Sequence, residues 1–250
     1  MRTRFVCSLA VGLALAVAAA PQEPAASGGR AARAAVPAGP VPRMSDGKPD
    51  LNGLLNGGLS SQDIGVNLAP GEQILLTPAA QKLMQSRRPK DDPEANCLPA
   101  GVPRMAPYPW RIVQQATHVF ILFEANIHSY RQILMDRSHI PEANRWPSWY
   151  GDSVGSWDGD TLVVDTVGFN DRFWFDAKGH PHTDQLHTIE RYTRKDSAAL
   201  VVETTVIDPG SYAKPFKVVY TARYAPKDEL MEYICAENNQ DVTHITTPTR

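Results

Sequence analysis

The sequence predicts an all-β protein in which a single antiparallel sheet closes into a barrel or curves strongly. From Cys97 onward, apolar and polar residues alternate with many β-branched and aromatic side chains. Runs of turn-forming residues separate the candidate strands, as at Asp158-Gly159-Asp160, Lys195-Asp196-Ser197 and Pro226-Lys227-Asp228. Long helical segments that would connect parallel strands are missing from the pattern. A two-sheet sandwich is the competing architecture.

The candidate strands follow one another in meander order. They are Arg111–Gln115, Thr117–Glu124, His128–Asp136, Ser153–Trp157, Thr161–Val167, Gln185–Arg194, Ala199–Asp208, Phe216–Tyr224 and Glu229–Ala236. A barrel of about eight to ten strands leaves room inside for one small ligand. Whether this interior is open or filled with side chains is left undecided by the sequence.

The N-terminal part predicts export. Residues 1–20 carry two arginines, an apolar run and Ala18-Ala19-Ala20, the layout of a secretory signal peptide with a small-residue cleavage site. The apolar run is short for a membrane span, so no stable span is expected after cleavage. We expect the mature protein in the periplasm or outside the cell.

The remaining chain divides into a linker and one domain. Residues 21–43 are rich in Ala, Pro and Gly and are expected to form a disordered linker. Residues 44–250 are expected to form a single β-rich domain with an irregular N-terminal region, of which residues 44–58 are rich in turn formers. Thr77-Pro78 predicts the N-cap and first turn of one short helix, AAQKLMQSRR, which Pro89 stops.

Cysteine and charge content limit the function classes. Cys97 and Cys235 remain after removal of Cys7, and a disulfide between them is expected in an oxidising compartment, with two buried free thiols as the alternative. The formal net charge of −2 becomes −4 without Arg2 and Arg4, and no dense Lys/Arg stripe remains. Nucleic acid is therefore an unsuitable partner.

Period-two alternation sorts the candidate catalytic residues of residues 185–194 into two faces. One face carries His187 and Arg191, which suit proton transfer beside a fixed cation. The other carries Glu190 and Tyr192, a carboxylate and a phenol. Only one face can line a cavity, and an ordinary solvated face with ion pairs is the alternative for each set.

Arg131 is expected to point inward because apolar residues flank it at two-residue spacing. A buried arginine needs a carboxylate partner or an anionic ligand, and Glu124 or Asp165 could serve. Asp165 lies between Val163 and Val167 and is expected to be buried for the same reason. In the catalytic hypothesis, Arg131 and Asp165 act on the substrate and Tyr130 assists them. The alternative is a purely structural ion pair between Arg131 and Asp165.

Aromatic residues gather in the two longest loops: Trp146, Trp149, Tyr150, Phe169, Phe173, Trp174 and Phe175. Long loops of compact domains are often functional. Trp149, Phe169 and Trp174 are expected to bind substrate as an apolar lid over the barrel mouth, together with His182 and Glu190. A second small core under the loops is the alternative.

Metal and nucleotide chemistry lack their usual signatures. His180, His182 and His187 with Asp184 could in principle bind zinc or iron, but their spacing matches no strong metal motif. The chain has no G-x-S-x-G elbow and no Gly-rich phosphate loop. We expect a site without metal or cofactor.

Several blocks resemble a large family of exported bacterial proteins, most of which have no assigned activity. The blocks are PDLNG, CLPAGVPR, PYPWRIVQ, GDSVGSWDGDTLVVDTVGFND, GHPHTDQLHTIER and YICAENN, and they cover nearly all of residues 46–241. The first block of this family more usually ends in Gly-x-Trp, as in lipocalin-like proteins, whereas Leu54-Leu55 follows Gly53 here. The resemblance implies a distantly lipocalin-like barrel and transfers no catalytic residue.

Two functions follow as hypotheses. The first is an extracytoplasmic lyase or isomerase that uses cofactor-free acid/base chemistry on a small, partly apolar organic molecule. In it, His187 shuttles the proton, Arg131 or Arg191 holds negative charge, and Asp165 or Glu124 orients them. The second is a non-catalytic carrier of small hydrophobic ligands. A structural or partner-binding envelope protein, with a filled barrel, is a third class, and the oligomeric state stays open.

Overall fold

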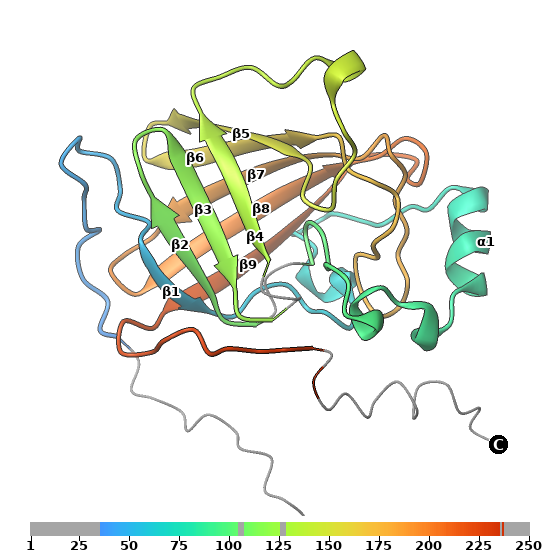
Figure 1. Cartoon of the computed structure of the whole chain (residues 1–250), viewed down its shortest axis with the longest axis horizontal. Helices are drawn as coiled ribbons and strands as arrows, with labels where there is room; N and C mark the ends of the chain where they lie inside the picture. The colour runs from blue at the N-terminus through green and yellow to red at the C-terminus, as the bar shows by residue number, and fades with distance from the viewer. Residues whose placement is uncertain (1–35, 105–107, 126–128, 236, 238–250) are drawn as a thin grey trace, which may run out of the picture. The chain divides into compact units, whose positions relative to one another are not determined.

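A computed structural model describes residues 36–104, 108–125, 129–235 and 237, which belong to one compact unit. Nine strands close a barrel in the order of the chain (Figure 1). They are β1 Gly53–Asn56, β2 Trp110–Gln114, β3 His118–Phe123, β4 Tyr130–Met135, β5 Asp152–Asp158, β6 Thr161–Val167, β7 His187–Arg194, β8 Ala199–Ile207 and β9 Phe216–Tyr224. The predicted closed all-β barrel is therefore confirmed, and the sandwich is excluded.

One pair of strands breaks the antiparallel meander. β4 and β5 are parallel, and their register covers only Ile133↔Ser153, Leu134↔Val154 and Met135↔Gly155. Consecutive parallel strands cannot be joined by a hairpin and need a long crossover. Residues 136–151 make this crossover, which includes the 3-10 helix η4 (Glu142–Asn144) and lies outside the barrel wall (Figure 1).

Two strand assignments from the sequence are wrong, and the errors are linked. The turn-rich residues 44–58 contain β1, whose four residues are too few to show alternation, and β1 pairs with both β2 and β9. Because β1 occupies the outer edge of β9, the sheet has no free edge for a further strand. Residues 229–235 accordingly contain no strand, and Ala236 lies outside the described residues.

Alternate residues of each strand fill the barrel interior. In β6, for example, Leu162, Val164 and Thr166 are buried, whereas their neighbours are half-buried. The hydrophobic core also includes Trp110, Ile121, Ile133, Val202, Val218 and Tyr220. Burial of each large apolar side chain contributes roughly 1.5–3 kcal/mol.

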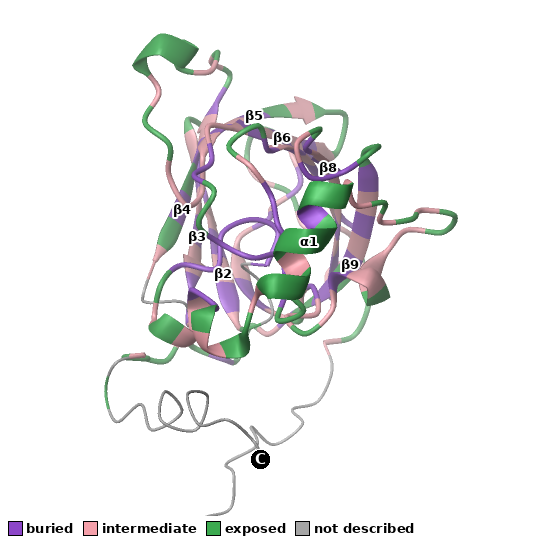
Figure 2. Ribbon diagram, turned by 90° about the vertical axis from the view of Figure 1, so that its right-hand side faces the viewer, coloured by how far each residue is buried: buried purple, intermediate pink, exposed green. Residues whose placement is uncertain are grey.

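The region before β2 is irregular and contains one α-helix, α1 (Pro78–Ser86), and three 3-10 helices, η1 (Ile64–Asn67), η2 (Pro89–Asp91) and η3 (Glu94–Asn96). As predicted, Thr77 caps α1: its Oγ1 accepts the amide of Ala80 at 3.2 Å, and Pro78 occupies the first turn. The helix ends at Ser86, two residues earlier than expected. Most of its surface is exposed, and Ala80 is its buried residue (Figure 2).

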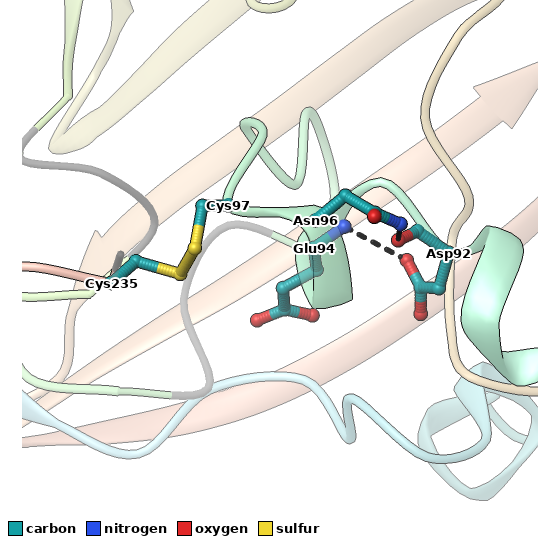
Figure 3. The surroundings of a disulfide bond; sticks show 5 residues. All are labelled: Asp92, Glu94, Asn96, Cys97 and Cys235. Atoms are coloured by element: carbon teal, nitrogen blue, oxygen red, sulfur yellow. Dashed lines mark hydrogen bonds between the residues drawn. A yellow bond between two sulfur atoms is a disulfide. The ribbon is translucent and has the colours of Figure 1, made fainter. Parts of the chain in front are cut away.

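The predicted disulfide between Cys97 and Cys235 is present, and it joins residues 138 positions apart (Figure 3). Cys97 follows η3, whose start is fixed by Asp92: its Oδ1 accepts the amide of Glu94 at 3.0 Å. Arg104, buried beside them, pairs with Asp92 at 2.9 Å and with Glu94 at 2.6 Å. The disulfide thus attaches the segment after β9 to a rigid ion-paired loop.

The N-terminal predictions are only partly covered. The signal peptide, Cys7 and residues 21–35 lie outside the described residues. Residues 36–43 were expected to be disordered, but they contact the barrel: the carbonyls of Pro37 and Gly39 accept hydrogen bonds from Ser197, and Arg43 pairs with Asp160 at 2.6 Å. None of the helices in the described ranges is long and apolar enough to cross a membrane.

Candidate functional site on the outer face of the barrel

The inward orientation expected of Arg131 is present, but its partner is neither Glu124 nor Asp165. The guanidinium lies inside the barrel and makes a two-pronged pair with Glu190, at 2.5 and 3.0 Å. Its remaining donors reach Thr166 Oγ1 at 2.8 Å and Ser153 Oγ at 3.1 Å. Both charged side chains are at most 1% exposed. The pair is therefore saturated by the protein itself.

Tyr192 completes this interior pair. Its hydroxyl donates to Glu190 at 2.8 Å, and burial, followed by the charge of Glu190, raises the pKa of Tyr192 well above its ordinary value. A phenol that stays protonated is a constant donor to the carboxylate. Glu190, expected to bind substrate, is thus a fixed counter-ion in the core. We call the buried group of Arg131, Glu190, Tyr192, Thr166 and Ser153 the interior polar centre. It suits fold stability better than catalysis.

The opposite face of β7 points outward. His187 and Arg191 are partly exposed there, with side chains 31% and 41% exposed. Arg191 pairs with Asp158 at 2.8 Å, so it has no contact with the interior polar centre. Asp165 is also on the outer face, with its side chain 40% exposed, which corrects the prediction of a buried carboxylate. The expected grouping of His187, Asp165 and Arg131 is therefore split by the barrel wall.

Outside the wall, four side chains form a continuous hydrogen-bonded chain. Asp165 Oδ1 lies 2.9 Å from His187 Nε2 and also 2.9 Å from His139 Nε2. The other ring nitrogen of His139 lies 3.1 Å from Asp152 Oδ2. The order is thus His187, Asp165, His139, Asp152, and it runs from the exposed edge of β7 to the start of β5.

His139 occupies the centre of this chain. Its two ring nitrogens lie within hydrogen-bond distance of two different carboxylates, Asp152 and Asp165. Burial opposes ionisation of Asp152, but hydrogen bonds from the amide of Ile140, from His139 and from Arg137 outweigh it and lower the pKa of the carboxyl. Asp152 therefore stays charged at neutral pH, and its oxygens hold the crossover loop against the barrel.

A groove of about 410 Å³ opens beside Asp152. It lies where the parallel seam is incomplete, because residues 130–132 of β4 have no partner on β5. Gly151 bends the chain away at this point: its φ is +65°, and a Cβ would lie 2.6 Å from a Thr166 methyl. The crossover covers the opening and supplies its cations, Arg137 and Arg145.

The groove has a polar floor and an aromatic rim. Arg131 and Ser153 of the interior polar centre border the groove. The groove therefore lies against the part of the barrel wall that encloses the buried ion pair of Arg131 and Glu190. Tyr130, expected to assist catalysis, also lines it and is 59% exposed. Trp146 lines it from the crossover and is 89% exposed. The groove therefore combines cations, a carboxylate and exposed aromatic rings.

The predicted aromatic lid is wrong. Phe169 and Trp174 are 0% and 5% exposed, and Trp149 packs partly buried against the core. Phe173 meets Phe169 edge-on, with ring centroids 5.9 Å apart. Phe169, Phe173 and Phe175 lie under the loops, as the alternative reading expected, but they continue the barrel core and do not form a separate one. Burying their large apolar area stabilises the fold more than exposing it.

His182, expected to bind substrate, packs among the aromatic rings under the loops. Its ring stacks on Phe175 with centroids 5.3 Å apart, and burial lowers its pKa to about 4. The neutral ring donates from Nδ1 to the carbonyl of Thr183, at 3.0 Å. A histidine that stays neutral inside an aromatic cluster is part of the packing.

The histidines considered as an alternative metal site are not brought together. His182 stacks on Phe175, His187 pairs with Asp165, and the buried His180 pairs with Asp176 at 2.6 Å. Across the described ranges, the group spaced to hold a metal ion is Asp63, Asp176 and His180. Lys178 already gives Asp63 a cation at 2.5 Å, so this group is satisfied as an ion-pair cluster.

Glu124 is remote from the roles expected of it. It is 9% exposed and its Oε2 accepts the amide of Met231 at 2.9 Å, so it anchors the segment after β9. Four site residues were missed by the sequence analysis: Arg137, His139, Arg145 and Asp152. Their signal was their concentration in residues 137–152, one of the two longest gaps between predicted strands, but their meeting with β6 and β7 depends on the crossover.

Comparisons with known proteins supply no function for this chain, so a function has to be argued from the geometry of the site. No protein family, no curated protein and no solved structure matches the chain.

Proposed function

We propose that the protein is an exported enzyme that performs acid/base chemistry on a small, partly apolar organic molecule bound in the outer groove. The observation that carries the proposal is the chain His187, Asp165, His139, Asp152, with 2.9, 2.9 and 3.1 Å between successive partners. One end borders the groove and the other is open to solvent. Elimination, hydration and isomerisation all need a proton moved in this way.

Asp152 is the catalytic residue in this proposal because it lines the groove. His139 positions it and passes protons between the two carboxylates. Asp165 and His187 extend the path to solvent, because the side chain of His187 is 31% exposed. Negative charge that develops on the substrate is stabilised by Arg137 and Arg145, which border the same groove. The chemistry uses side chains alone.

Export is part of the proposal and rests on two features. The first is the signal-like sequence of residues 1–20. The second is the disulfide between Cys97 and Cys235, a bond that persists in oxidising compartments. The periplasm and the extracellular space both satisfy this requirement.

Binding without turnover is the second candidate, and it rests on how fully Asp152 is engaged. Its oxygens accept from Arg137, His139 and the amide of Ile140, as an anchor for the crossover would. In that case, the groove is a ligand site and the histidines only hold its wall. In this candidate, the ligand is bound in the groove outside the barrel wall.

His187→Ala separates the two candidates, because His187 is part of the proton path but does not line the groove. We would offer the exported protein a panel of carbon acids in deuterated water and detect deuterium incorporation by mass spectrometry. The enzyme proposal expects exchange of at least one compound in wild type and a loss of at least tenfold in His187→Ala with unchanged binding. Arg191→Gln, on the same outer face of β7, is the matched control and should retain activity.

Two results would count against the enzyme. One is binding of panel compounds without any exchange in wild type, which would favour the binding module. The other is exchange that survives in both His187→Ala and Asp152→Asn, which would show that the hydrogen-bonded chain has no part in it. Native mass spectrometry with metal analysis of the same preparation would identify any retained ligand or metal.

A further inference from the structure

We propose that the outer groove selects small organic carboxylates, with Arg145 as the docking cation and Trp146 as an apolar wall. The inference rests on the proposed function only for the location of the site, because binding can be measured without turnover. It names the ligand class that the proposed enzyme or binding module would take.

Arg145 supplies a charge that no carboxylate of the described residues neutralises. Its Nε and Nη2 donate to the carbonyl of Ile140, at 3.2 and 2.8 Å. Among the described residues, no carboxylate forms an ion pair with it. A guanidinium has five N–H donors in a planar fork, so donors remain for a ligand.

The other charges of the groove are already balanced. Arg131 is neutralised by Glu190 at 2.5 Å. Arg137 pairs with Asp152, which also faces His139. Within the part of the chain that the structure describes, Arg145 is therefore the groove arginine without a carboxylate partner, and its charge favours an anionic group on the ligand.

Arg145 is also held in place before any ligand arrives. Its aliphatic stem lies directly over Gly168: a Cβ at that position would be 2.2 Å from the Arg145 Cδ. Gly168 has a φ of +73°, which L side chains rarely adopt, so two constraints keep this position free of a side chain. A fixed guanidinium loses less entropy on binding than a free one.

The size and walls of the groove define the body of the ligand. A volume of about 410 Å³ is in the range of small-molecule sites. Trp146, Tyr130 and Ile140 line it and are 89%, 59% and 40% exposed. Exposed aromatic faces bind flat or apolar groups. Aromatic or short aliphatic monocarboxylates combine both requirements.

The test compares carboxylates with their neutral amides. Benzoate, phenylacetate, cinnamate and hexanoate, each beside its amide, would be titrated into the exported protein and followed by the indole NMR signals. We expect at least one acid to bind about tenfold or more tightly than its amide, as a charge-assisted hydrogen bond provides. Arg145→Gln should remove this preference, while Arg223→Gln, an exposed arginine of β9, should keep it.

Equal binding of acid and amide, or a preference that survives Arg145→Gln, would overturn the inference. Retained stability of Arg145→Gln in urea would show that its effect is on binding and not on folding. The outcomes remain separate from those of the proposed function. Deuterium exchange of a neutral compound without carboxylate binding would refute only the ligand class, and Arg145-dependent binding without exchange would refute only the enzyme.

Discussion

Glu190→Gln is the substitution whose effect follows most directly from the structure. It leaves the charge of Arg131 inside the barrel, where the side chain is 0% exposed, without a counter-ion. Removing one member of a buried pair costs about 3–5 kcal/mol of unfolding free energy. For a dependence of about 2 kcal/mol per molar urea, the unfolding midpoint should fall by about 1.5–2.5 M.

The neighbouring residue on β7 provides the control. Arg191 pairs with Asp158 at 2.8 Å, but the two side chains are 41% and 68% exposed. Water screens such a pair, so Arg191→Gln should change the unfolding free energy by less than about 1 kcal/mol. Adjacent positions on one strand thus differ severalfold in expected effect because one faces the core and the other faces water.

The assay is urea unfolding followed by circular dichroism, with the disulfide intact. The double variant Arg131→Met with Glu190→Leu should recover much of the lost stability, because apolar replacement of both partners removes the stranded charge. If Glu190→Gln loses no more than Arg191→Gln, the interior location of the ion pair is wrong. If the double variant is as unstable as Glu190→Gln, the cost lies in packing and not in the unpaired charge.

Three further predictions test other parts of the molecule. Because burial lowers the pKa of His182 to about 4, below its value near 6.5 in the unfolded chain, unfolding takes up a proton between these values and acid destabilises the fold. Protonation of His182 should lower the unfolding free energy by about 2 kcal/mol between pH 7 and pH 5. Urea titrations at the two pH values should show this loss in wild type and not in His182→Phe. An equal loss of unfolding free energy in both proteins would refute the prediction. Replacing both cysteines of the disulfide by serine should cost about 3–5 kcal/mol, given a chain-entropy value of about 5 kcal/mol for 138 residues, and a loss below about 1 kcal/mol would contradict this. Gly168→Ala should displace Arg145 and abolish the acid preference of the groove, whereas Gly47→Ala, at φ +82° with nothing within 4 Å, should leave the preference intact.

The sequence alone determined what depends on local patterns. Alternation and turn residues are properties of short segments, and they indicated the barrel, most of its strands and the capped helix. Arg131 could be assigned inward because its flanking residues on the same face are apolar. The two cysteines required only an oxidising compartment and a fold that brings them together.

Tertiary structure decided the partners and the site. Period two shows which residues share a face, but β6 carries valines on both faces, so the outward position of Asp165 could not be predicted from it. The partner of Arg131 is Glu190, 59 residues away, and such a contact depends on the registers of three successive strand pairs, from β4 to β7. Pairing of β4 with β5 in parallel is likewise a property of the closed sheet. Because parallel neighbours cannot be joined by a short turn, that pairing requires the crossover of residues 136–151. The crossover brings His139 and Asp152 to Asp165, and the groove opens beside them.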